Sequence, residues 1–510
     1  MSTVAHATVV IMLMNLLSKV LGFVRETVIA REYGATSLTD AYNAAYTIPY
    51  FLQMVLGMAL VTSIVPVLTR HFMKGEDAEA WRVSSITLNW TVLAMAVLSL
   101  GGMGGARAVV DLITPGFSEA TAGLAASLTV IMFPSVVFMS VGMLFTGMLN
   151  ARKRFAAAAF APGFSNLVII AAVLLVGRYG VQYLAWGTLA GMAGAMLIQV
   201  PVLRRAGFRY TWNWDTGNQE VRGICLNLLP IFLGTAVNQV YLAINRYFAS
   251  GLSEGSISAL NYAGKLMNLP LGIFVLAVSS AIFPTLSEQA VREDRESLGL
   301  TLNRGLKMVL LVTMPAAAGL MALDTPIVRL LFERGAFDSL ATRMTAGALF
   351  YFSAGMFAMA VNMVLTRAYY ALGDVRTPLY TGLLSILVNI IASILLIRPL
   401  GHSGLALANT VAAVFSAVSM YLLLKLHLSR LHAGDLLATG VKSLAASLLT
   451  GAAALGTYRY LAEAVFIRQE GKTLALAIMA GVAAYAASIL ALREKEALGL
   501  VRKFFSRAGF

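Results

Sequence analysis

The chain has 510 residues, of which 59% are hydrophobic and only 12% are charged, and its mean hydropathy is +0.78. Soluble globular chains have about a quarter of their residues charged, so this composition excludes that class and indicates a polytopic membrane protein. The net charge of +14 does not indicate nucleic-acid binding, because the cations are scattered between apolar runs. The single cysteine, Cys225, excludes a disulfide framework and a cysteine-based metal site.

Long apolar runs recur along the whole chain. At about 20 apolar residues per crossing, they predict fourteen membrane-spanning helices. The first run lacks a small-residue cleavage site and is therefore expected to be a membrane helix and not a removable signal. The predicted helices cover residues 6–33, 37–70, 84–105, 123–148, 156–177, 181–202, 224–251, 257–286, 301–322, 344–371, 378–397, 403–426, 438–460 and 473–492.

The loops between these helices differ in charge. Alternate loops on one side, together with the C-terminal tail, hold 24 of the 38 Lys and Arg residues, and the loops on the other side hold 9. Cytoplasmic loops of membrane proteins carry the excess of cations. The distribution therefore predicts a multi-pass protein with both termini in the cytoplasm.

A weak internal repeat relates the two halves of the chain. One constant shift along the sequence places Asn43 on Asn261 and Pro66 on Pro284. Because six helices separate the repeats, both halves have the same orientation and can rock about a central site. We therefore expect an all-α fold with two pseudo-symmetric six-helix lobes, residues 1–218 and 219–430, followed by a C-terminal helix pair and tail, residues 431–510.

Two of the predicted helices contain an internal proline. Pro49 lies in the second predicted helix and Pro270 in the eighth. Each proline removes a backbone hydrogen bond and kinks its helix. The kinks are either static bends or hinges for movement of the lobes.

Charged residues interrupt the first predicted helix. Ser18, Lys19, Arg25 and Glu26 fall within one arc of about 120° when the segment is helical. Lys or Arg at this depth costs about 2.5–3.5 kcal/mol on insertion scales, so such residues usually face a wet cavity or a partner. Two interpretations remain open: an internal ion pair that joins two helices, or a cationic site for an anionic ligand.

The second half of the chain also carries charges within predicted helices. Lys265 is interpreted as the counterpart of Lys19, and both are candidates to bind phosphate as point charges. Arg246 either joins them or lies at the outer end of its helix, where its charge reaches water. Asp40 opens the second predicted helix, so it is either an N-terminal cap or a functional carboxylate.

Motifs for catalysis are missing from the sequence. It contains no phosphate-binding loop of the P-loop type, no His-Glu-x-x-His and no dinucleotide fingerprint. Its five histidines lie at predicted helix ends or in loops without metal-ligand spacing. We therefore expect a transporter and not an enzyme, with no cofactor, driven by the membrane potential or by a gradient of an ion that the sequence does not identify.

Four segments closely resemble one known family. They are residues 18–26 (SKVLGFVRE), 39–45 (TDAYNAA), 147–155 (GMLNARKRF) and 370–378 (YALGDVRTP). Their sequence and order resemble the MurJ (MviN) lipid II flippases of the MOP exporter superfamily. The resemblance implies two six-helix lobes around a central cavity, with a C-terminal helix pair that forms a groove for a lipid tail.

The same resemblance implies a substrate and a location. The substrate is lipid II, the undecaprenyl-diphosphate-linked peptidoglycan precursor, which moves from the inner to the outer leaflet of the bacterial cytoplasmic membrane. Expected partners are lipid II or a similar polyprenyl-diphosphate glycan, membrane lipids and the cell-wall synthesis machinery, and no nucleic acid is expected. The implied role is in peptidoglycan synthesis, cell-wall biogenesis and cell shape.

The resemblance also assigns residues to the substrate site. Lys19 and Lys265 stand where enterobacterial members have Arg, while Gln53 replaces an arginine, Met58 an acid, and Gly264 and Asn268 charged residues. Some members bind sodium, but Asn245, Asn389 and Ser393 offer no carboxylate here, so no metal site is predicted. The predicted substrate-binding residues are Ser18, Lys19, Arg25, Glu26, Asp40, Gln53, Arg246, Lys265 and Asn268.

The sequence supports one main hypothesis and keeps alternatives. The main hypothesis is alternating access, in which Lys19, Arg25 and Lys265 bind the diphosphate while the lobes rock. One alternative is a flippase for another polyprenyl-diphosphate-linked oligosaccharide of capsule or exopolysaccharide. The others are a non-transporting membrane scaffold for envelope synthesis and, more distantly, a glycosyltransferase.

Overall fold

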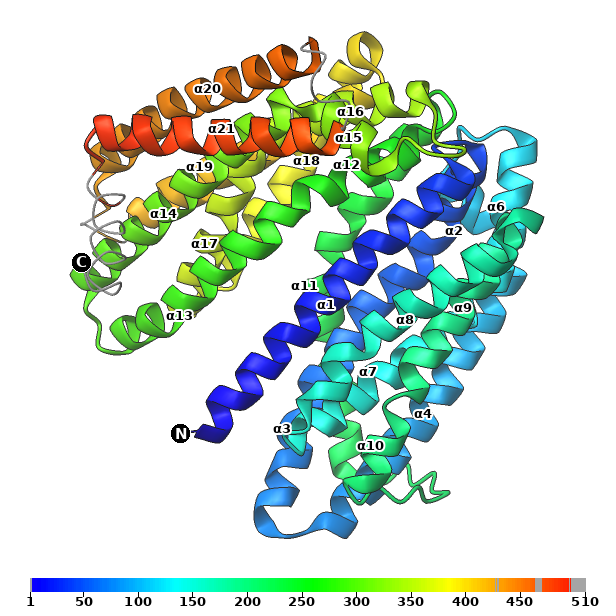
Figure 1. Ribbon diagram of the computed structural model, residues 1–510. Helices are drawn as coiled ribbons and strands as arrows, with labels where there is room; N and C mark the ends of the chain where they lie inside the picture. Colours follow the sequence, from blue (N-terminus) through cyan, green and yellow to red (C-terminus); the bar gives the residue numbers. More distant parts are fainter. Residues whose placement is uncertain (1, 427, 429–430, 464–469, 495, 497–510) are drawn as a thin grey trace. The chain divides into compact units, whose positions relative to one another are not determined.

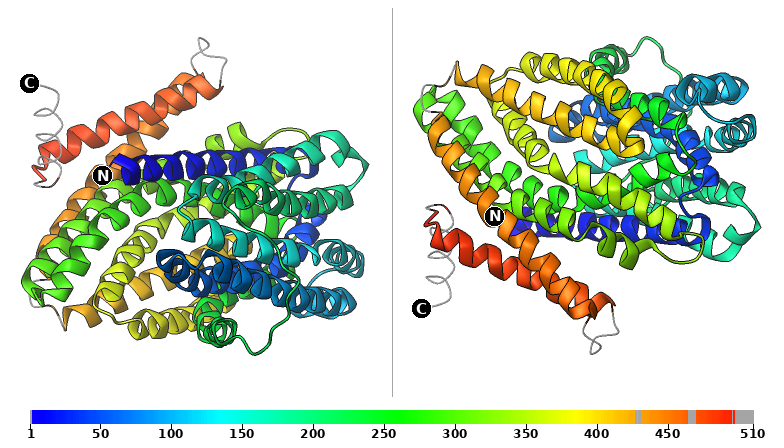
Figure 2. Two further views of the ribbon diagram at one scale, coloured as in Figure 1. Left: turned by 90° about the horizontal axis from the view of Figure 1, so that it is seen from below. Right: turned by 90° about the horizontal axis from the view of Figure 1, so that it is seen from above.

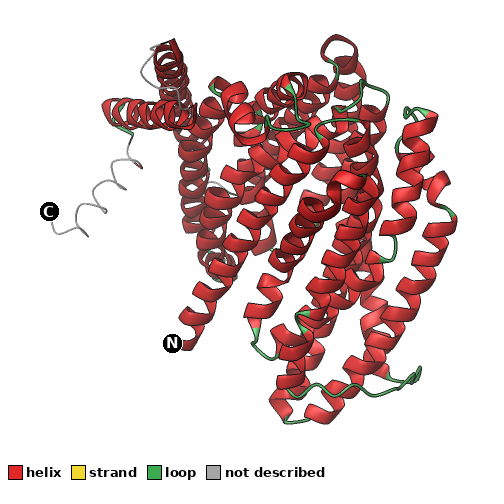
Figure 3. Ribbon diagram, turned by 45° about the vertical axis from the view of Figure 1, so that its right-hand side comes forward, coloured by secondary structure: helices red, strands yellow, loops and turns green. Residues whose placement is uncertain are grey.

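The computed structural model describes residues 2–426, 428, 431–463, 470–494 and 496, and for residues 2–11 and 227–240 it describes the backbone alone. The described residues form helices and connecting loops without any β-strand (Figure 3). By their contacts, they divide into two compact units. The first comprises Met1–Ser258 with Arg334–Phe337, and the second comprises Ala259–Glu333 with Asp338–Phe510.

The helices of the first unit are for the most part labelled in Figure 1. In chain order they are α1 (Ser2–Tyr33), α2 (Ser37–Leu52), the π-helix η1 (Gln53–Gly57), α3 (Met58–Lys74), α4 (Asp77–Gly104), α5 (Ala106–Ile113), α6 (Glu119–Met132), α7 (Ser135–Ala151), α8 (Phe155–Val176), the 3-10 helix η2 (Gly177–Tyr179), α9 (Val181–Leu197), α10 (Val200–Arg205) and α11 (Gln219–Ser250).

The second unit begins inside the next helix. In chain order its helices are α12 (Ser256–Pro270), the π-helix η3 (Leu271–Val275), α13 (Leu276–Val291), α14 (Arg295–Ala322), α15 (Asp324–Phe332), α16 (Ser339–Ala354), α17 (Met356–Ala371), α18 (Arg376–Leu400), α19 (His402–Lys425), α20 (Ala433–Glu463) and α21 (Glu470–Ala491).

The boundary between the units differs from the predicted boundary between the lobes. Helix α11 contacts α2, α3, η1, α4 and α5, so it belongs to the first unit by contact. The predicted lobes were defined by an internal repeat and the units are defined by contacts. The lobes 1–218 and 219–430 and the separate segment 431–510 therefore stay a prediction.

Membrane-spanning helices are numerous, as the composition predicts. In the described part of the chain, ten helices are long and apolar enough to cross a membrane. The count rises to twelve if each of two bent pairs, α6 with α7 (42°) and α16 with α17 (47°), is one span. The predicted number of fourteen is not confirmed. Helices α1 and α11, of 32 residues each, fill the two other predicted positions, and the side chains of both are described only in part.

The order of helices repeats along the chain at the predicted spacing. The π-helices η1 and η3 begin at Gln53 and Leu271, related by the same shift that places Asn43 on Asn261, and each is five residues long. The second helix after each π-helix, α4 in the first half and α14 in the second, has 28 residues. They begin at positions related by this shift as well, Asp77 and Arg295. Two bent pairs, α6–α7 and α16–α17, then follow in the same order. The internal repeat inferred from a few identities is therefore visible in the helices themselves.

Each π-helix interrupts a predicted span next to a proline. Pro49 lies four residues before η1, and Pro270 directly precedes η3. Proline has no N–H group and its ring crowds the preceding turn. A wider i→i+5 turn accommodates this local loss of regular hydrogen bonding. The structure thus contains a π-turn beside each predicted kink.

Two apolar clusters hold the first unit together. One joins α1, α2, α5, α6, α8 and α9 through fully buried residues such as Ala45, Leu128 and Ile169. The other joins α3, α4, α7, α10 and α11 through residues such as Ile64, Leu144 and Met148. Burying one leucine, isoleucine or methionine side chain of these clusters stabilises the fold by about 1.5–3 kcal/mol. These clusters fix α1 against α8 and α2 against α6, which positions the charged residues of α1 and α2.

The C-terminal helices α20 and α21 pack against each other and against α14 (Figures 1 and 2). The Tyr485 hydroxyl of α21 donates a hydrogen bond of 2.7 Å to the carbonyl oxygen of Leu311 in α14. The Ser443 hydroxyl of α20 lies 3.1 Å from the Tyr485 hydroxyl. Buried polar groups in a span need such partners, so the three helices are joined by a polar contact inside an apolar interface.

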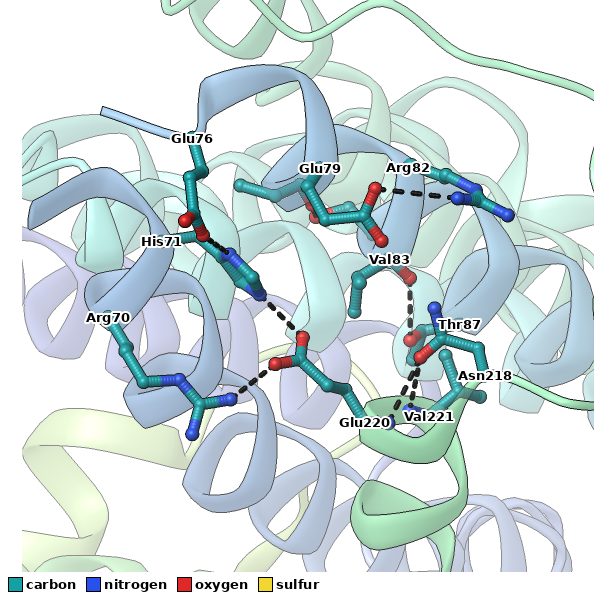
Figure 4. Close-up of polar contacts among 12 residues, drawn as sticks. Arg70, His71, Glu76, Glu79, Arg82, Val83, Thr87, Asn218, Glu220 and Val221 are labelled. Atoms are coloured by element: carbon teal, nitrogen blue, oxygen red, sulfur yellow. Dashed lines mark hydrogen bonds and ion pairs between the residues drawn. The ribbon is translucent and has the colours of Figure 1, made fainter. Parts of the chain in front are cut away.

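A polar cluster fixes the beginning of α11 to the turn between α3 and α4 (Figure 4). The two ring nitrogens of His71 lie 2.7 Å from Glu76 Oε2 and 2.6 Å from Glu220 Oε2. Arg70 also pairs with Glu220. Two carboxylates facing both nitrogens of one imidazole favour the doubly protonated ring, which donates from both.

The N-terminal cap of α11 gives a prediction about stability. The Asn218 side-chain oxygen accepts hydrogen bonds from the Glu220 and Val221 N–H groups, at 3.0 and 3.1 Å. Replacing Asn218 with alanine should lower the free energy of unfolding by about 1 kcal/mol, because two N–H groups lose their acceptor. Thermal unfolding of the purified protein measures this effect. Asn218→Asp, which keeps the acceptor, is the control and should unfold with the parent.

Candidate functional site

The polar face of α1 lies against α8. Arg25 Nη2 lies 2.5 Å from Glu26 Oε1, and Arg25 Nη1 donates a 3.0 Å hydrogen bond to Asn166 Oδ1. The Asn166 amide in turn donates to the Ser18 carbonyl oxygen at 3.2 Å, and the Ser18 hydroxyl donates to the Ala159 carbonyl oxygen at 3.2 Å. The Arg25–Glu26 ion pair agrees with the first interpretation of the α1 charges, a structural pair. The polar cluster around Arg25 is compatible with the second, a cationic site for an anionic ligand.

Tyrosines of α2 lie close to Arg25. The rings of Tyr42 and Tyr46 stack with centroids 6.2 Å apart, and those of Tyr46 and Tyr50 lie 5.7 Å apart. The charge of Arg25 acts on all three hydroxyl groups. A guanidinium carries five N–H donors, and Arg25 forms hydrogen bonds to Glu26 and Asn166 through its Nε, Nη1 and Nη2 nitrogens. Each terminal nitrogen holds a second N–H, which suits an anionic oxygen.

Lys19 lies on the same helix as Arg25 but is exposed. Their positions differ by about 9 Å along the axis at 1.5 Å per residue. The Lys19 side chain already makes a polar or electrostatic contact within the described part of the chain. The exposure of its side chain agrees with a role in binding an anion.

Asp40 binds the beginning of α12. Its carboxylate accepts hydrogen bonds from the Gly255 N–H at 2.8 Å, the Ser258 N–H at 2.8 Å and the Ser258 hydroxyl at 2.6 Å. It does not cap its own helix, because α2 begins after Thr36, whose N–H donates to the Thr39 hydroxyl at 3.0 Å. Asp40 therefore caps a helix that is distant in the sequence, where the first N–H groups lack partners within the helix.

Arg246 of α11 also contacts the first turn of α12. It is only 9% exposed, its Nη1 donates to the Ile257 carbonyl oxygen at 3.3 Å, and its charge faces that of Asp40. The buried Arg246 Nε has no hydrogen-bond partner among the described residues. Its burial excludes the interpretation that Arg246 extends to water at the outer end of its helix. The pair holds α11, α2 and the start of α12 together.

The remaining predicted site residues lie on α12 or at η1. Gln53 is the first residue of η1 and is partly buried, whereas Met58, just after η1, is 48% exposed. On α12, Lys265 is half-buried and Asn268 is exposed, with its amide donating to the Gly264 carbonyl oxygen at 2.8 Å. Lys265 and Asn268 belong to the second unit, and the other seven predicted residues belong to the first.

The pairing of Lys19 with Lys265 as counterparts was wrong. Lys19 lies in α1 and Lys265 in α12, and the repeat makes α12 the equivalent of α2. By the shift that relates η1 to η3, Lys265 corresponds to Thr47 and not to any residue of α1. The two lysines therefore lie at non-equivalent positions of the repeat.

Sequence reasoning missed two parts of this region. Asn166 joins Arg25 to Ser18, and an amide in the middle of the apolar helix α8 was a signal that went unused. The second part is the contact in which the Gly255 and Ser258 N–H groups donate hydrogen bonds to the Asp40 carboxylate. The only local signal for that contact was the lack of an acidic residue in the first turn of α12.

The region implied as a sodium site in some relatives offers neutral groups. Asn389 and Ser393 are fully buried in α18, and their side-chain polar atoms have no hydrogen-bond partner among the described residues. Within the described part of the chain, no three His, Cys, Asp or Glu side chains lie close enough to bind a metal ion. A hard cation prefers charged oxygen ligands, so these residues fit such an ion poorly.

Known proteins resemble this chain over most of its length. The family model described as lipid II flippase MurJ matches residues 29–489. The chain belongs to this family. A lipid II flippase MurJ of Burkholderia cenocepacia is 32% identical over 421 residues, covering 80% of this chain and 81% of the relative. A probable lipid II flippase MurJ of Vibrio cholerae is 30% identical over 506 residues, covering 95% of each chain.

Solved structures agree with membership of the MurJ family. A lipid II flippase MurJ in an inward closed conformation matches with a TM-score of 0.79 and 26% identity, covering 94% of this chain and 98% of that chain. An inward-facing multidrug resistance MATE transporter of the MOP superfamily matches with a TM-score of 0.68 at 14% identity, covering 83% of this chain and 98% of that chain. The second match shows the shared fold alone. The predicted MurJ family and all-helical membrane fold are thus confirmed.

Proposed function

We propose that this chain moves lipid II from the inner to the outer leaflet of the bacterial cytoplasmic membrane. The observation that carries the proposal is the near full-length match to lipid II flippases, in sequence and in structure. The buried and half-buried cations agree with it, since a diphosphate needs positive charge that a membrane interior otherwise disfavours. The comparisons favour this substrate over another lipid-linked oligosaccharide and over a scaffold.

In the proposed mechanism, Lys19, Arg25 and Lys265 bind the diphosphate during alternating access. Arg25 supplies the N–H groups beyond its contacts to Glu26 and Asn166, and the lysines supply point charges. The π-helices η1 and η3 are placed where two spans can bend. Ser18, Glu26, Asp40 and Arg246 act by positioning α1 and α12.

The proposal includes an orientation and a driving force. Both termini lie in the cytoplasm, as the excess of cations in alternate loops predicts. The protein acts as a transporter, without catalysis and without a cofactor. Transport is driven by the membrane potential, at about 2.3 kcal/mol per charge per 100 mV, or by an ion gradient. The polyprenyl tail remains in lipid, in contact with the helices α20 and α21, and the product passes to the cell-wall synthesis machinery.

Transport by the purified protein tests the proposal. The protein is reconstituted into vesicles that hold lipid II with a labelled headgroup in the inner leaflet, and the label reaching the outside is measured with a membrane-impermeant quencher. We expect transfer that increases when a membrane potential is imposed. Vesicles that transfer no lipid II, although the inserted protein is folded, would refute the function.

The same assay gives a prediction for Lys265. A Lys265→Ala variant should transfer lipid II at least about tenfold more slowly, the effect of losing one charged hydrogen bond to phosphate. The matched control is Lys307→Ala, since Lys307 is another partly buried lysine of the second unit, where it pairs with Asp435. A Lys265→Ala variant as active as the control would remove this residue from the proposed site.

A further inference from the structure

The first unit contains a pocket whose lining residues do not include any residue of α1 or α2. It has a volume of about 400 Å³ and lies between α4, α7, α10 and the loop after α10. Its walls are apolar, formed by Leu88, Phe145, Val200 and Leu203. This volume lies within the usual range of ligand pockets, about 300–1,000 Å³.

The rim of this pocket is cationic. Arg204 and Arg209 line it together with Tyr210. Among the described residues, neither arginine forms an ion pair, whereas Arg82 in the neighbouring α4 pairs with Asp215 at 3.2 Å. The lining includes no acidic residue. Two guanidinium groups above an apolar cavity match a molecule with an anionic end and an apolar end.

The loop that carries the rim is fixed to α4. The Tyr210 hydroxyl donates a 2.7 Å hydrogen bond to Asn89 Oδ1, and the Thr211 N–H donates to the Ser85 hydroxyl at 3.2 Å. The Asn89 amide donates to the Asn213 carbonyl oxygen at 2.8 Å. A site held in place in this way loses little conformational entropy when a ligand binds.

Three tryptophans place this loop at the membrane surface. The indole rings of Trp90 and Trp214 lie 5.5 Å apart, those of Trp212 and Trp214 lie 5.6 Å apart, and Trp212 is 76% exposed. The candidate span Val181–Arg205 ends at the pocket rim. Tryptophan and tyrosine gather at the headgroup level of membranes. Arg204 and Arg209 are therefore expected at the depth of the lipid phosphates.

We propose that this pocket binds an anionic phospholipid, with its phosphate between Arg204 and Arg209 and the upper part of an acyl chain against Phe145 and Leu203. On the orientation predicted by the loop charges, the lipid comes from the cytoplasmic leaflet. Anionic lipids give that leaflet its negative surface, and basic pockets beside membrane helices bind their headgroups. The site is separate from the proposed substrate residues and is a binding site for a resident lipid.

Quenching of tryptophan fluorescence tests the site directly. The full-length protein carries Trp186→Phe, which removes one of five tryptophans and leaves Trp81, Trp90, Trp212 and Trp214. It is placed in phosphatidylcholine vesicles with a rising share of phosphatidylglycerol brominated on its acyl chains. We expect stronger quenching than with brominated phosphatidylcholine at the same share, and less of this difference at high salt.

Charge variants locate the effect. An Arg204→Gln/Arg209→Gln variant should require about 10- to 30-fold more brominated phosphatidylglycerol for half-maximal quenching, the effect of losing two interfacial cations. Arg205→Gln is the matched control, because Arg205 is an exposed arginine of the same helix that does not line the pocket. The control should behave like the parent.

Three results would overturn the proposal. One is equal quenching by the two brominated lipids, and another is unchanged selectivity in the double variant. The third is displacement of brominated phosphatidylglycerol by lipid II at lower concentrations than by unlabelled phosphatidylglycerol, which would make the pocket part of the substrate path. Lipid II transfer in vesicles is measured in parallel, so a failure of the lipid site is distinguishable from a failure of the proposed function.

Discussion

An Arg25→Met variant should lose about 3–5 kcal/mol of stability, because it removes the cation that pairs with the buried Glu26 carboxylate. The Glu26 side chain is only 5% exposed, and Arg25 Nη2 lies 2.5 Å from it. The variant also removes the hydrogen bond that Arg25 Nη1 donates to Asn166 Oδ1. Thermal unfolding of the purified protein in detergent measures the loss, and the amount of folded protein in membranes should fall with it.

A double variant separates the structural role of Arg25 from the proposed functional role. In Arg25→Met/Glu26→Gln both charges are removed, so most of the stability should return while lipid II transfer stays lost. Arg178→Met is the control, since Arg178 is an exposed arginine of the same unit, and it should change stability by less than about 0.5 kcal/mol. A double variant that is stable and transports like the parent would leave Arg25 with only the structural role.

Asp40→Ala should destabilise the protein by a similar amount, about 3–5 kcal/mol. The carboxylate is 4% exposed and accepts three hydrogen bonds from Gly255 and Ser258. Its loss leaves these donors without an acceptor and Arg246 without a facing charge. Because α12 carries Lys265, transport should fall together with stability.

An exposed capping aspartate provides the comparison for Asp40. Asp338 accepts a 2.8 Å hydrogen bond from the Ala341 N–H at the start of α16, and its side chain is exposed. Asp338→Ala should therefore cost only about 1 kcal/mol. Asp40→Asn keeps the shape of the side chain but turns one acceptor into a donor. Its loss of stability should lie between those of Asp40→Ala and Asp338→Ala. Equal costs for Asp40→Ala and Asp338→Ala would show that the buried contact adds nothing to ordinary capping.

The architecture was largely predictable from the sequence because it depends on repeated apolar runs. The constant shift between the two halves was inferred from pairs such as Asn43 with Asn261, and η1 and η3 begin at the same spacing. The π-helices themselves were not predicted. Pro49 and Pro270 predict a kink, but how the chain satisfies the lost hydrogen bonds depends on packing around the kink.

The candidate site was predictable only where its contacts are local. Arg25 and Glu26 are adjacent, so their pairing was one of the two interpretations of the α1 charges. The Asp40 contact joins residues that are far apart in the sequence, and no pattern within α2 indicates it. Arg246 was ambiguous for the same reason, since a cation near a helix end is either buried or at the surface according to what lies beside it.

Growth of bacteria depleted of their own lipid II flippase tests the central claim most directly. The parent chain is expressed in such cells, with its membrane insertion checked, and growth is followed together with the arrival of lipid II in the outer leaflet. We expect the parent to restore both and the Arg25→Met/Glu26→Gln variant to restore neither. A parent that is inserted and folded, yet restores neither growth nor outward lipid II, would contradict the assignment of lipid II as its substrate.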